Sequence, residues 1–217
     1  MQGLIFIPDI SGFTNFVKNI DIDLGVSITS DLLNEIIDNN PLDLDISEIE
    51  GDAVLYYKIG KPIPLQQVFN GFQHMYEAFD TKYQRWKLLY NIEADLSLKL
   101  IVHYGDIMVY DIKGFKKLYG ETVIESHRLL KNGSDATEYM LVTEDYVKAS
   151  QQNISDVLVR DFEYNAYTSQ LYTGVKKIAY YFFSTINKAS RISKRMAQKN
   201  AITDDVYLAV GTAEAVL

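Results

Sequence analysis

Two aspartates lie where a divalent metal ion and a phosphate could be held. Asp9 ends an apolar run that begins at Leu4, a pattern typical of a buried strand, and a turn containing Gly12 follows. Asp52 directly follows Gly51, between two apolar stretches. Carboxylates bind Mg²⁺ or Mn²⁺, and the free backbone N–H groups of a glycine turn can face an anion. The plainer interpretation of Asp9 is an aspartate in an ordinary strand-to-helix turn, so the rest of the chain must decide.

The composition limits the classes of protein to which this 217-residue chain can belong. Its net charge of −8 argues against a general nucleic-acid or anionic-membrane surface. The absence of cysteine excludes disulfides, thiolate catalysis and zinc sites built on cysteine. No stretch approaches about 18 uninterrupted apolar residues, and no signal-peptide pattern opens the chain. We therefore expect a soluble cytoplasmic protein with no nucleic-acid or membrane partner.

Hydrophobic periodicity predicts the elements that must position the two aspartates. The clearest helix has apolar and aromatic residues at intervals of three and four from Leu65 to Tyr90, which indicates a face turned to the core. Thr14 is a plausible N-cap for a short helix, and residues 21–25 look irregular. The other predicted helices are 27–39, 121–131 and 143–150, and the predicted strands are 4–7, 42–47, 53–57, 96–104, 107–110, 138–142, 157–164, 169–173 and 178–183.

The order of these elements predicts an α+β fold. Within residues 3–142 the order is β-α-β-β-α-β, that of a ferredoxin-like (split βαβ), antiparallel-rich sheet. Such a sheet places the end of its first strand beside the hairpin of the next two, which would bring Asp9 and Asp52 together. We expect one domain over 1–186, with extra C-terminal strands, and a C-terminal helical extension over 187–217 packed on the domain or on a partner. The extension is basic, which fits a solvated helix face, a dimer contact or a site for an anion or partner; its basic residues are Lys188, Arg191, Lys194, Arg195 and Lys199.

Three separated segments carry a family resemblance. The first, Phe6-Ile-Pro-Asp-Ile-Ser-Gly-Phe-Thr14, and the second, Ile49-Glu-Gly-Asp-Ala-Val54, resemble the two metal motifs of the class III nucleotidyl cyclases, Phe-x-Asp-Ile-x-Gly-Phe-Thr and Ile-Gly-Asp-Ala. The third, Ile101-Val-His-Tyr-Gly105 with Tyr119-Gly-Glu-Thr-Val-Ile-Glu-Ser-His-Arg-Leu129, is similar to the family's His-x-Gly strand and its Gly-Asp-Thr-Val-Asn-x-Ala-x-Arg helix. The resemblance covers roughly residues 3–183 and identifies the chain as a divergent member of the family.

The resemblance implies a site for a metal–nucleoside triphosphate. Asp9 and Asp52 would hold two divalent ions, Mg²⁺ or Mn²⁺. Arg128 would stabilise phosphate charge in the transition state of a composite site, which implies a homodimer; the alternative is a surface ion pair between Arg128 and Glu125. Lys176 or its neighbour is a candidate for the family's last phosphate-contacting lysine. The segment expected to lie along the triphosphate is Ile10, Ser11, Gly12, Phe13 and Thr14.

Two further positions would select the base. Glu48 stands where guanylyl cyclases carry glutamate, and it could accept hydrogen bonds from guanine N1–H and N2–H. Lys117 replaces the family's aspartate or cysteine, and it could donate to guanine O6 or to a pyrimidine carbonyl. The alternative is that Lys116 and Lys117 form a solvated turn.

The main departure from the family is Ile124, where the family has an asparagine that holds the ribose. This change leaves three hypotheses: an active cyclase (a phosphorus–oxygen lyase) that forms a 3′,5′-cyclic nucleotide and pyrophosphate, a pseudo-cyclase that acts as a nucleotide-binding or protein-interaction dimer, and a structural domain that binds no nucleotide. We interpret His103 and His127 as packing or surface residues rather than ligands.

Overall fold

The computed structural model describes residues 1–156, 162–172 and 176–185. The basic extension predicted over 187–217, and the boundary before it, lie outside these residues. In chain order the elements are β1 (Gln2–Ser11), α1 (Phe13–Lys18), α2 (Ile22–Asp38), β2 (Asp45–Glu50), β3 (Ala53–Ile59), α3 (Leu65–Tyr90), β4 (Ser97–Asp106), β5 (Met108–Ile112), β6 (Phe115–Tyr119), α4 (Glu121–Leu129), β7 (Tyr139–Thr143), α5 (Glu144–Ser150), a short 3₁₀ turn (Ile154–Asp156), β8 (Phe162–Leu171) and β9 (Lys177–Thr185).

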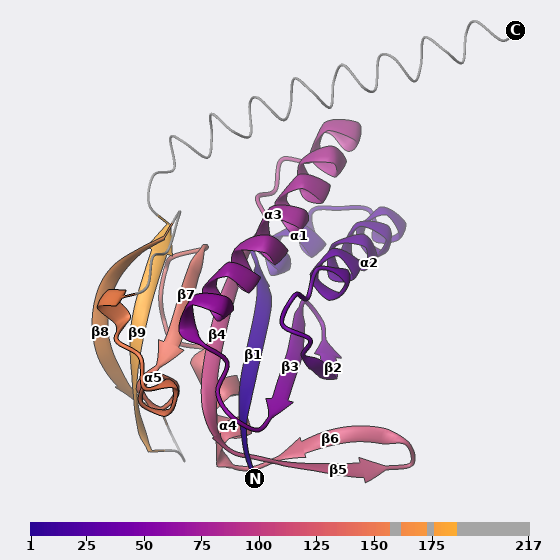
Figure 1. Cartoon of the computed structure of the whole chain (residues 1–217). Helices are drawn as coiled ribbons and strands as arrows, with labels where there is room; N and C mark the ends of the chain where they lie inside the picture. The colour runs from indigo at the N-terminus through magenta and orange to yellow at the C-terminus, as the bar shows by residue number, and fades with distance from the viewer. Residues whose placement is uncertain (157–161, 173–175, 186–217) are drawn as a thin grey trace, which may run out of the picture.

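A seven-stranded sheet organises the molecule, with strand order β2-β3-β1-β4-β7-β9-β8 (Figure 1). The first four strands pair antiparallel in the ferredoxin-like order, with β1 between β3 and β4. β7 joins β4 in parallel, and β9 and β8 extend the sheet antiparallel. The predicted fold class, including the extra C-terminal strands, is therefore confirmed.

The central strands β1, β4 and β7 are buried on both faces, which explains why β1 is apolar at consecutive positions. Leu4 and Phe6 pack with the aromatic stripe of α3, where Phe72 and Phe79 are fully buried. Ile5 and Ile7 pack on the opposite face with Leu129 of α4, the helix that covers this face (Figure 1). Each large apolar side chain buried in this way contributes about 1.5–3 kcal/mol to folding. Because side chains alternate between the two faces of a strand, the position of each polar residue in β1 and β4 determines the face on which its side chain lies.

One predicted hairpin is wrong. The predicted strands 96–104 and 107–110, separated by two residues, imply an antiparallel hairpin with a turn at residues 105–106. Instead β4 continues to Asp106, and β5 pairs with β6 in a separate two-stranded sheet, the β5–β6 ribbon. The chain turns at Lys113 and Gly114, whose φ angles of 54° and 86° suit a tight hairpin. The Asp111 carboxylate accepts the Gly114 N–H, which stabilises the turn. Figure 1 shows the β5–β6 ribbon projecting from the end of the sheet near the N-terminus.

Two more boundary differences have local causes, a helix cap and a backbone conformation. α2 begins at Ile22, within the stretch predicted to be irregular, because the Asp21 carboxylate accepts the N–H groups of Asp23 and Leu24. β2 begins three residues later than predicted, because Asp43 adopts a positive φ of 51° that a strand cannot continue through.

The C-terminal strands differ in number from the prediction. β8 is one strand over 162–171 where two were predicted, because a run of polar residues along an edge strand resembles a turn in sequence. Residues 157–161 and 173, which the two predicted strands also included, lie outside the described ranges.

Candidate functional site

The structure brings Asp9 and Asp52 together. Asp9 lies near the end of β1, opposite Ala53 of β3 and Lys99 of β4. Asp52 immediately precedes Ala53, in a turn made possible by the positive φ of Gly51. The Ile10 N–H donates to the Asp52 carbonyl oxygen over 3.1 Å, which ties the turn to β1. The two carboxylates therefore stand next to each other at one end of the two adjacent strands, as the topology predicted.

Asp9 is buried, Asp52 is partly buried, and a single ammonium faces their two carboxylates. Asp9 is only 8% exposed, and its pKa is raised from 3.8 to about 6, mainly because of burial, with Lys99 lowering the pKa and Asp52 raising it. Burial also raises the pKa of Asp52. One ammonium for two carboxylates leaves a net negative site with oxygen donors, which is the environment that Mg²⁺ or Mn²⁺ requires.

Lys99 is a site residue that the sequence analysis did not select. Its ammonium lies 3.2 Å from Asp9 Oδ2 and its side chain is 20% exposed. The signal in the sequence is alternation: Leu98 and Leu100 face α3, so Lys99 must share the other face with Ile101. A lysine on a buried sheet face needs a partner, and Asp9 is that partner.

The glycine turn after β1 differs in detail from the prediction. Gly12, and not Thr14, is the N-cap of α1, with a φ of 86°. A Cβ on Gly12 would lie 2.3 Å from the Asp95 carbonyl oxygen, so only glycine fits. No side chain caps α1, so the N–H groups of Phe13 and Thr14 have no intrahelical acceptor. The Ile10 N–H, by contrast, is already donated to the Asp52 carbonyl, and so it is not available to a phosphate.

Ser11 is the remaining residue of the predicted phosphate segment. It is 8% exposed and lies opposite Ser97 in the β1–β4 pair. Ser11 is the last residue of β1 and lies between Asp9 and the glycine turn, so it stays beside the paired carboxylates.

The two predicted base-selecting residues also meet. The Lys117 ammonium of β6 donates to the Glu48 carboxylate of β2, and this bond raises the pKa of Lys117. His127 of α4 lies 3.8 Å from both Glu48 and Glu50. Glu48 lies within β2 rather than in the turn after it, and Lys117 pairs with Tyr110 inside the ribbon, so the alternative of a solvated turn is wrong.

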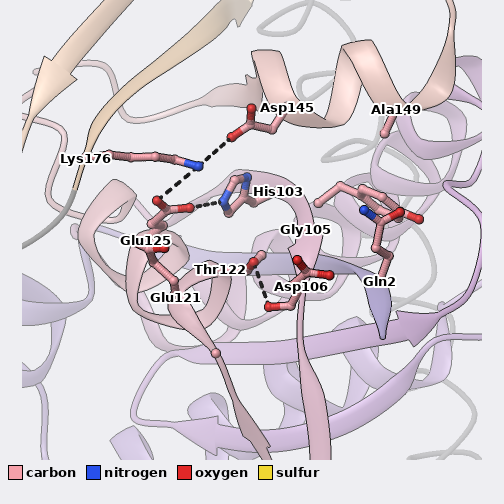
Figure 2. Close-up of a pocket in the computed structure, with 12 residues that line it drawn as sticks. Gln2, His103, Gly105, Asp106, Glu121, Thr122, Glu125, Asp145, Ala149 and Lys176 are labelled. Atoms are coloured by element: carbon pink, nitrogen blue, oxygen red, sulfur yellow. Dashed lines mark hydrogen bonds and ion pairs between the residues drawn. The ribbon is translucent and has the colours of Figure 1, made fainter.

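α4 presents Ile124 and Arg128 on one exposed face, one turn apart. Ile124 is 53% exposed, an unusual position for a large apolar side chain. The alternative pairing of Arg128 with Glu125 does not form, because Glu125 is 1% exposed and contacts His103 on the other side of the helix. Lys176 lies 3.4 Å from Glu125 Oε1 and 3.3 Å from Asp145 Oδ2, so its ammonium is held by two carboxylates (Figure 2).

Residues 29–139 match the model of a family described as "Protein of unknown function (DUF2652)". The chain belongs to the DUF2652 family. An uncharacterized protein of Mycobacterium tuberculosis, Rv2561/Rv2562, is 26% identical to this DUF2652 protein over 139 residues, which are 59% of the chain and 65% of that relative. The match thus spans slightly less than two thirds of the relative's own length.

Solved structures similar to this DUF2652 protein include nucleotidyl cyclases. The adenylyl cyclase CyaB from P. aeruginosa superposes with a TM-score of 0.65 at 15% identity, over 86% of this chain and 94% of that one. The guanylyl cyclase Cya2 gives 0.62 at 14% identity, over 87% and 94%. The guanylate cyclase domain of RhGC from Catenaria anguillulae, solved with GTP, gives 0.59 at 15% identity, over 86% and 97%. The DUF2652 chain therefore has the catalytic-domain fold of the class III nucleotidyl cyclases. Among its described residues, no helix is both long enough and apolar enough to cross a membrane.

Proposed function

We propose that this DUF2652 protein is a divergent nucleotidyl cyclase that binds a metal–nucleoside triphosphate and converts it to a 3′,5′-cyclic nucleotide and pyrophosphate. The observation that carries the proposal is the pair of buried Asp9 and partly buried Asp52, at the point where β1 meets the β2–β3 hairpin. A buried and a partly buried carboxylate with one compensating ammonium are costly to a domain that binds no cation. The pair therefore supports a metal site over a purely structural role.

Asp9 and Asp52 would hold two Mg²⁺ or Mn²⁺ ions. Their fit rests on the chemistry of the donors, because hard divalent cations prefer carboxylate oxygens, and on the burial that raises the pKa of both groups, whose cost a bound cation would offset. Ions bound there neutralise phosphate charge and make the attacking hydroxyl more acidic.

Other side chains and N–H groups would position the triphosphate. The ammonium of Lys99, already beside Asp9, is placed to contact a phosphate oxygen bound at the same ions. The N–H groups of Phe13 and Thr14 offer neutral donors next to it. Arg128, exposed on α4, would act on the site of the other protomer, where a planar guanidinium suits developing phosphate charge. Lys176 would join them on release from its two carboxylates.

A homodimer is supported by the surface that carries Arg128 and the base-selecting pair. Apolar side chains are exposed on β2, the β5–β6 ribbon and α4, where a single chain gains nothing by exposing them. These side chains are Ile46, Ile49, Met108, Phe115, Tyr119 and Ile124.

The Glu48–Lys117 pair supports a preference for guanine or for a pyrimidine with a carbonyl and an N–H. Such a base can accept from Lys117 and donate to Glu48 at the same time. Adenine offers an amino donor and a ring acceptor in these places, which reverses the polarity that the pair requires.

A second candidate function is a nucleotide-binding pseudo-cyclase that acts as a regulatory dimer. Ile124 favours it, because an isoleucine on the face of Arg128 neither donates to nor accepts from a ribose. Positioning of the attacking group supplies several kcal/mol of a reaction barrier, so its loss slows turnover by orders of magnitude while leaving phosphate binding intact.

One experiment separates these candidates. The protein is incubated with Mn²⁺ and each of the four nucleoside triphosphates, and cyclic products are measured by mass spectrometry beside thermal stability. Cyclic product that disappears in Asp52→Ala and persists in the exposed control Asp43→Ala supports the cyclase. Stabilisation by Mn²⁺–triphosphate without product supports the pseudo-cyclase. If neither cyclic product nor thermal stabilisation is observed, both candidate functions are overturned.

A further inference from the structure

A second polar site lies farther along β4. His103 follows Lys99 by four residues and shares its face of the strand, so the two α-carbons are about 13 Å apart. Beside His103 opens a pocket of about 410 Å³ between β4, α4 and α5, lined by Asp106, Glu121 and Asp145 among others (Figure 2). Among the residues that line this pocket, only Lys176, which directly precedes β9, is also proposed to contact the nucleotide.

His103 is fixed from both ring nitrogens. It is 1% exposed; Nε2 lies 2.7 Å from Glu125 Oε2 and Nδ1 lies 2.8 Å from Thr143 Oγ1. Thr143 also accepts the N–H of Tyr146 as the N-cap of α5, so its hydroxyl proton is free to point at Nδ1. That assigns the proton of a neutral ring to Nε2, donated to Glu125. The hydrogen bond from Thr143 to Nδ1 therefore holds the imidazole with Nε2 toward Glu125.

Glu125 has an unused oxygen. The residue is 1% exposed, and its Oε1 accepts no hydrogen bond from the residues that the structure describes. The nearest cation is the Lys176 ammonium at 3.4 Å, which also lies 3.3 Å from Asp145 Oδ2. A buried carboxylate oxygen without a hydrogen bond costs free energy, so this group requires a cation.

We infer that His103, Glu125 and Asp145 form a binding site for a divalent transition-metal ion, with Zn²⁺ as the best-fitting occupant. One imidazole and two carboxylates are a donor set that Zn²⁺ binds well. In the metal-free protein the Lys176 ammonium fills the cationic position between Glu125 and Asp145. Its side chain is 54% exposed, so it can withdraw into solvent when an ion enters.

The geometry requires only small movements. The ligand atoms of the three residues lie within 4.8 Å of one another. Two ligands about 2.1 Å from a tetrahedral ion are about 3.4 Å apart, so the His103–Glu125 contact must open slightly and the Asp145 carboxylate must approach. An ion at Nε2 would move the ring proton to Nδ1, and Thr143 could then accept from Nδ1–H, the usual support for a metal-bound histidine. The remaining coordination position faces the pocket. Entry of the ion would also free Lys176, the side chain proposed above to contact phosphate, but the metal site does not depend on that role.

The test uses the variant Asp9→Asn/Asp52→Asn, so that ions bound at the proposed nucleotide site do not contribute. Zn²⁺ is titrated calorimetrically into the EDTA-treated, desalted protein. We expect one Zn²⁺ per chain and little dependence of the binding enthalpy on the buffer, because the proton displaced from His103 Nε2 is taken up at Nδ1 and the ring stays neutral. Absence of binding in this variant overturns the inference, whatever the outcome of the nucleotide experiment.

Four further changes, made in the same variant, assign the ligands. Asp145→Asn and His103→Gln are expected to weaken Zn²⁺ binding by roughly tenfold or more. Asp145 is half exposed, so Asp145→Asn keeps the test valid if His103→Gln does not fold. Lys176→Met removes the competing ammonium and is expected to tighten binding. The matched control His127→Gln lies in the exposed Glu48–Glu50 group and is expected to leave affinity unchanged. If His127→Gln loses Zn²⁺ binding, or if Asp145→Asn keeps full Zn²⁺ affinity, the ion lies elsewhere and the assignment is refuted.

Discussion

Replacing Asp9 with asparagine is expected to stabilise the metal-free protein at neutral pH. Asparagine keeps the size of the side chain and removes the charge that burial disfavours. Because the pKa of Asp9 is raised in the folded state, the folded protein binds this proton more tightly than the unfolded chain does. The wild type is therefore favoured below the ordinary pKa and loses stability as the pH rises through the folded value.

The magnitude follows from the size of the shift. The pKa of Asp9 rises from 3.8 to about 6, and each pKa unit corresponds to about 1.4 kcal/mol, so the charged form costs about 3 kcal/mol above pH 6. Asp9→Asn is expected to recover an amount of this order at pH 7.5, which raises the melting temperature of a chain of this size by about 6–12 °C. The gain is expected to shrink toward zero as the pH falls to 4.

The assay is urea unfolding in EDTA at several pH values between 4 and 8. Lys99→Met provides a change of opposite sign, because the lost ammonium lowers the pKa of Asp9 in the wild type. It is expected to reduce stability above pH 6 and to have little effect once Asp9 is already asparagine. With Mn²⁺ added, the wild type is expected to gain stability and Asp9→Asn to gain less. A gain from Asp9→Asn that is absent at pH 7.5, or equally large at pH 4, would refute the electrostatic argument.

Three more variants test other parts of the structure. Gly12→Ala forces a Cβ against the Asp95 carbonyl at a positive φ, and is expected to cost about 2 kcal/mol or more, measured by thermal unfolding; an unchanged melting temperature would contradict the close approach. Glu48→Lys combined with Lys117→Asp reverses the polarity of the base-selecting pair, and is expected to shift the ratio of GTP to ATP affinity toward ATP by roughly tenfold, measured with Mn²⁺ by calorimetry; a constant ratio would remove the pair from base selection. Ile124→Asn restores a hydrogen-bonding side chain one turn from Arg128, and is expected to raise cyclic-nucleotide formation without changing triphosphate affinity; an unchanged rate would show that α4 does not reach the ribose.

The sequence predicted most accurately where a local pattern and the tertiary structure agree. The aromatic stripe of α3 and the Thr143 cap are such cases, because spacing and capping are local properties. The same holds for Asp9 and Asp52, since a strand order inferred from element order was enough to bring them together.

The failures arise where distant residues decide. The β5–β6 ribbon was missed because Gly105 resembles a turn, whereas its strand continues through pairing with Gly3. Lys99 was passed over, and His103 was interpreted as a packing or surface residue rather than a ligand. Their partners, Asp9 and Glu125, come from other elements, and nothing in the local sequence indicates which polar side chain a buried lysine or histidine meets. Burial of the histidine on the inward face is predictable; its bond to Glu125 is not.

The separation of the β5–β6 ribbon from the main sheet has a consequence for how tightly different parts of a nucleotide are recognised. A two-stranded ribbon is only marginally stable, so its amide hydrogens are expected to exchange with solvent through local opening, whereas those of β1, buried and paired on both sides, exchange only on global unfolding. In the proposed nucleotide complex, Asp9 would thus be held ready before any ligand arrives, while Lys117, on the ribbon and bonded to Glu48, would lose further mobility on contact. Contacts to the base would therefore carry an entropic cost that contacts to the phosphates would not. Analogues that differ in the number of phosphates are expected to span a wider range of affinity than analogues that differ only in the base.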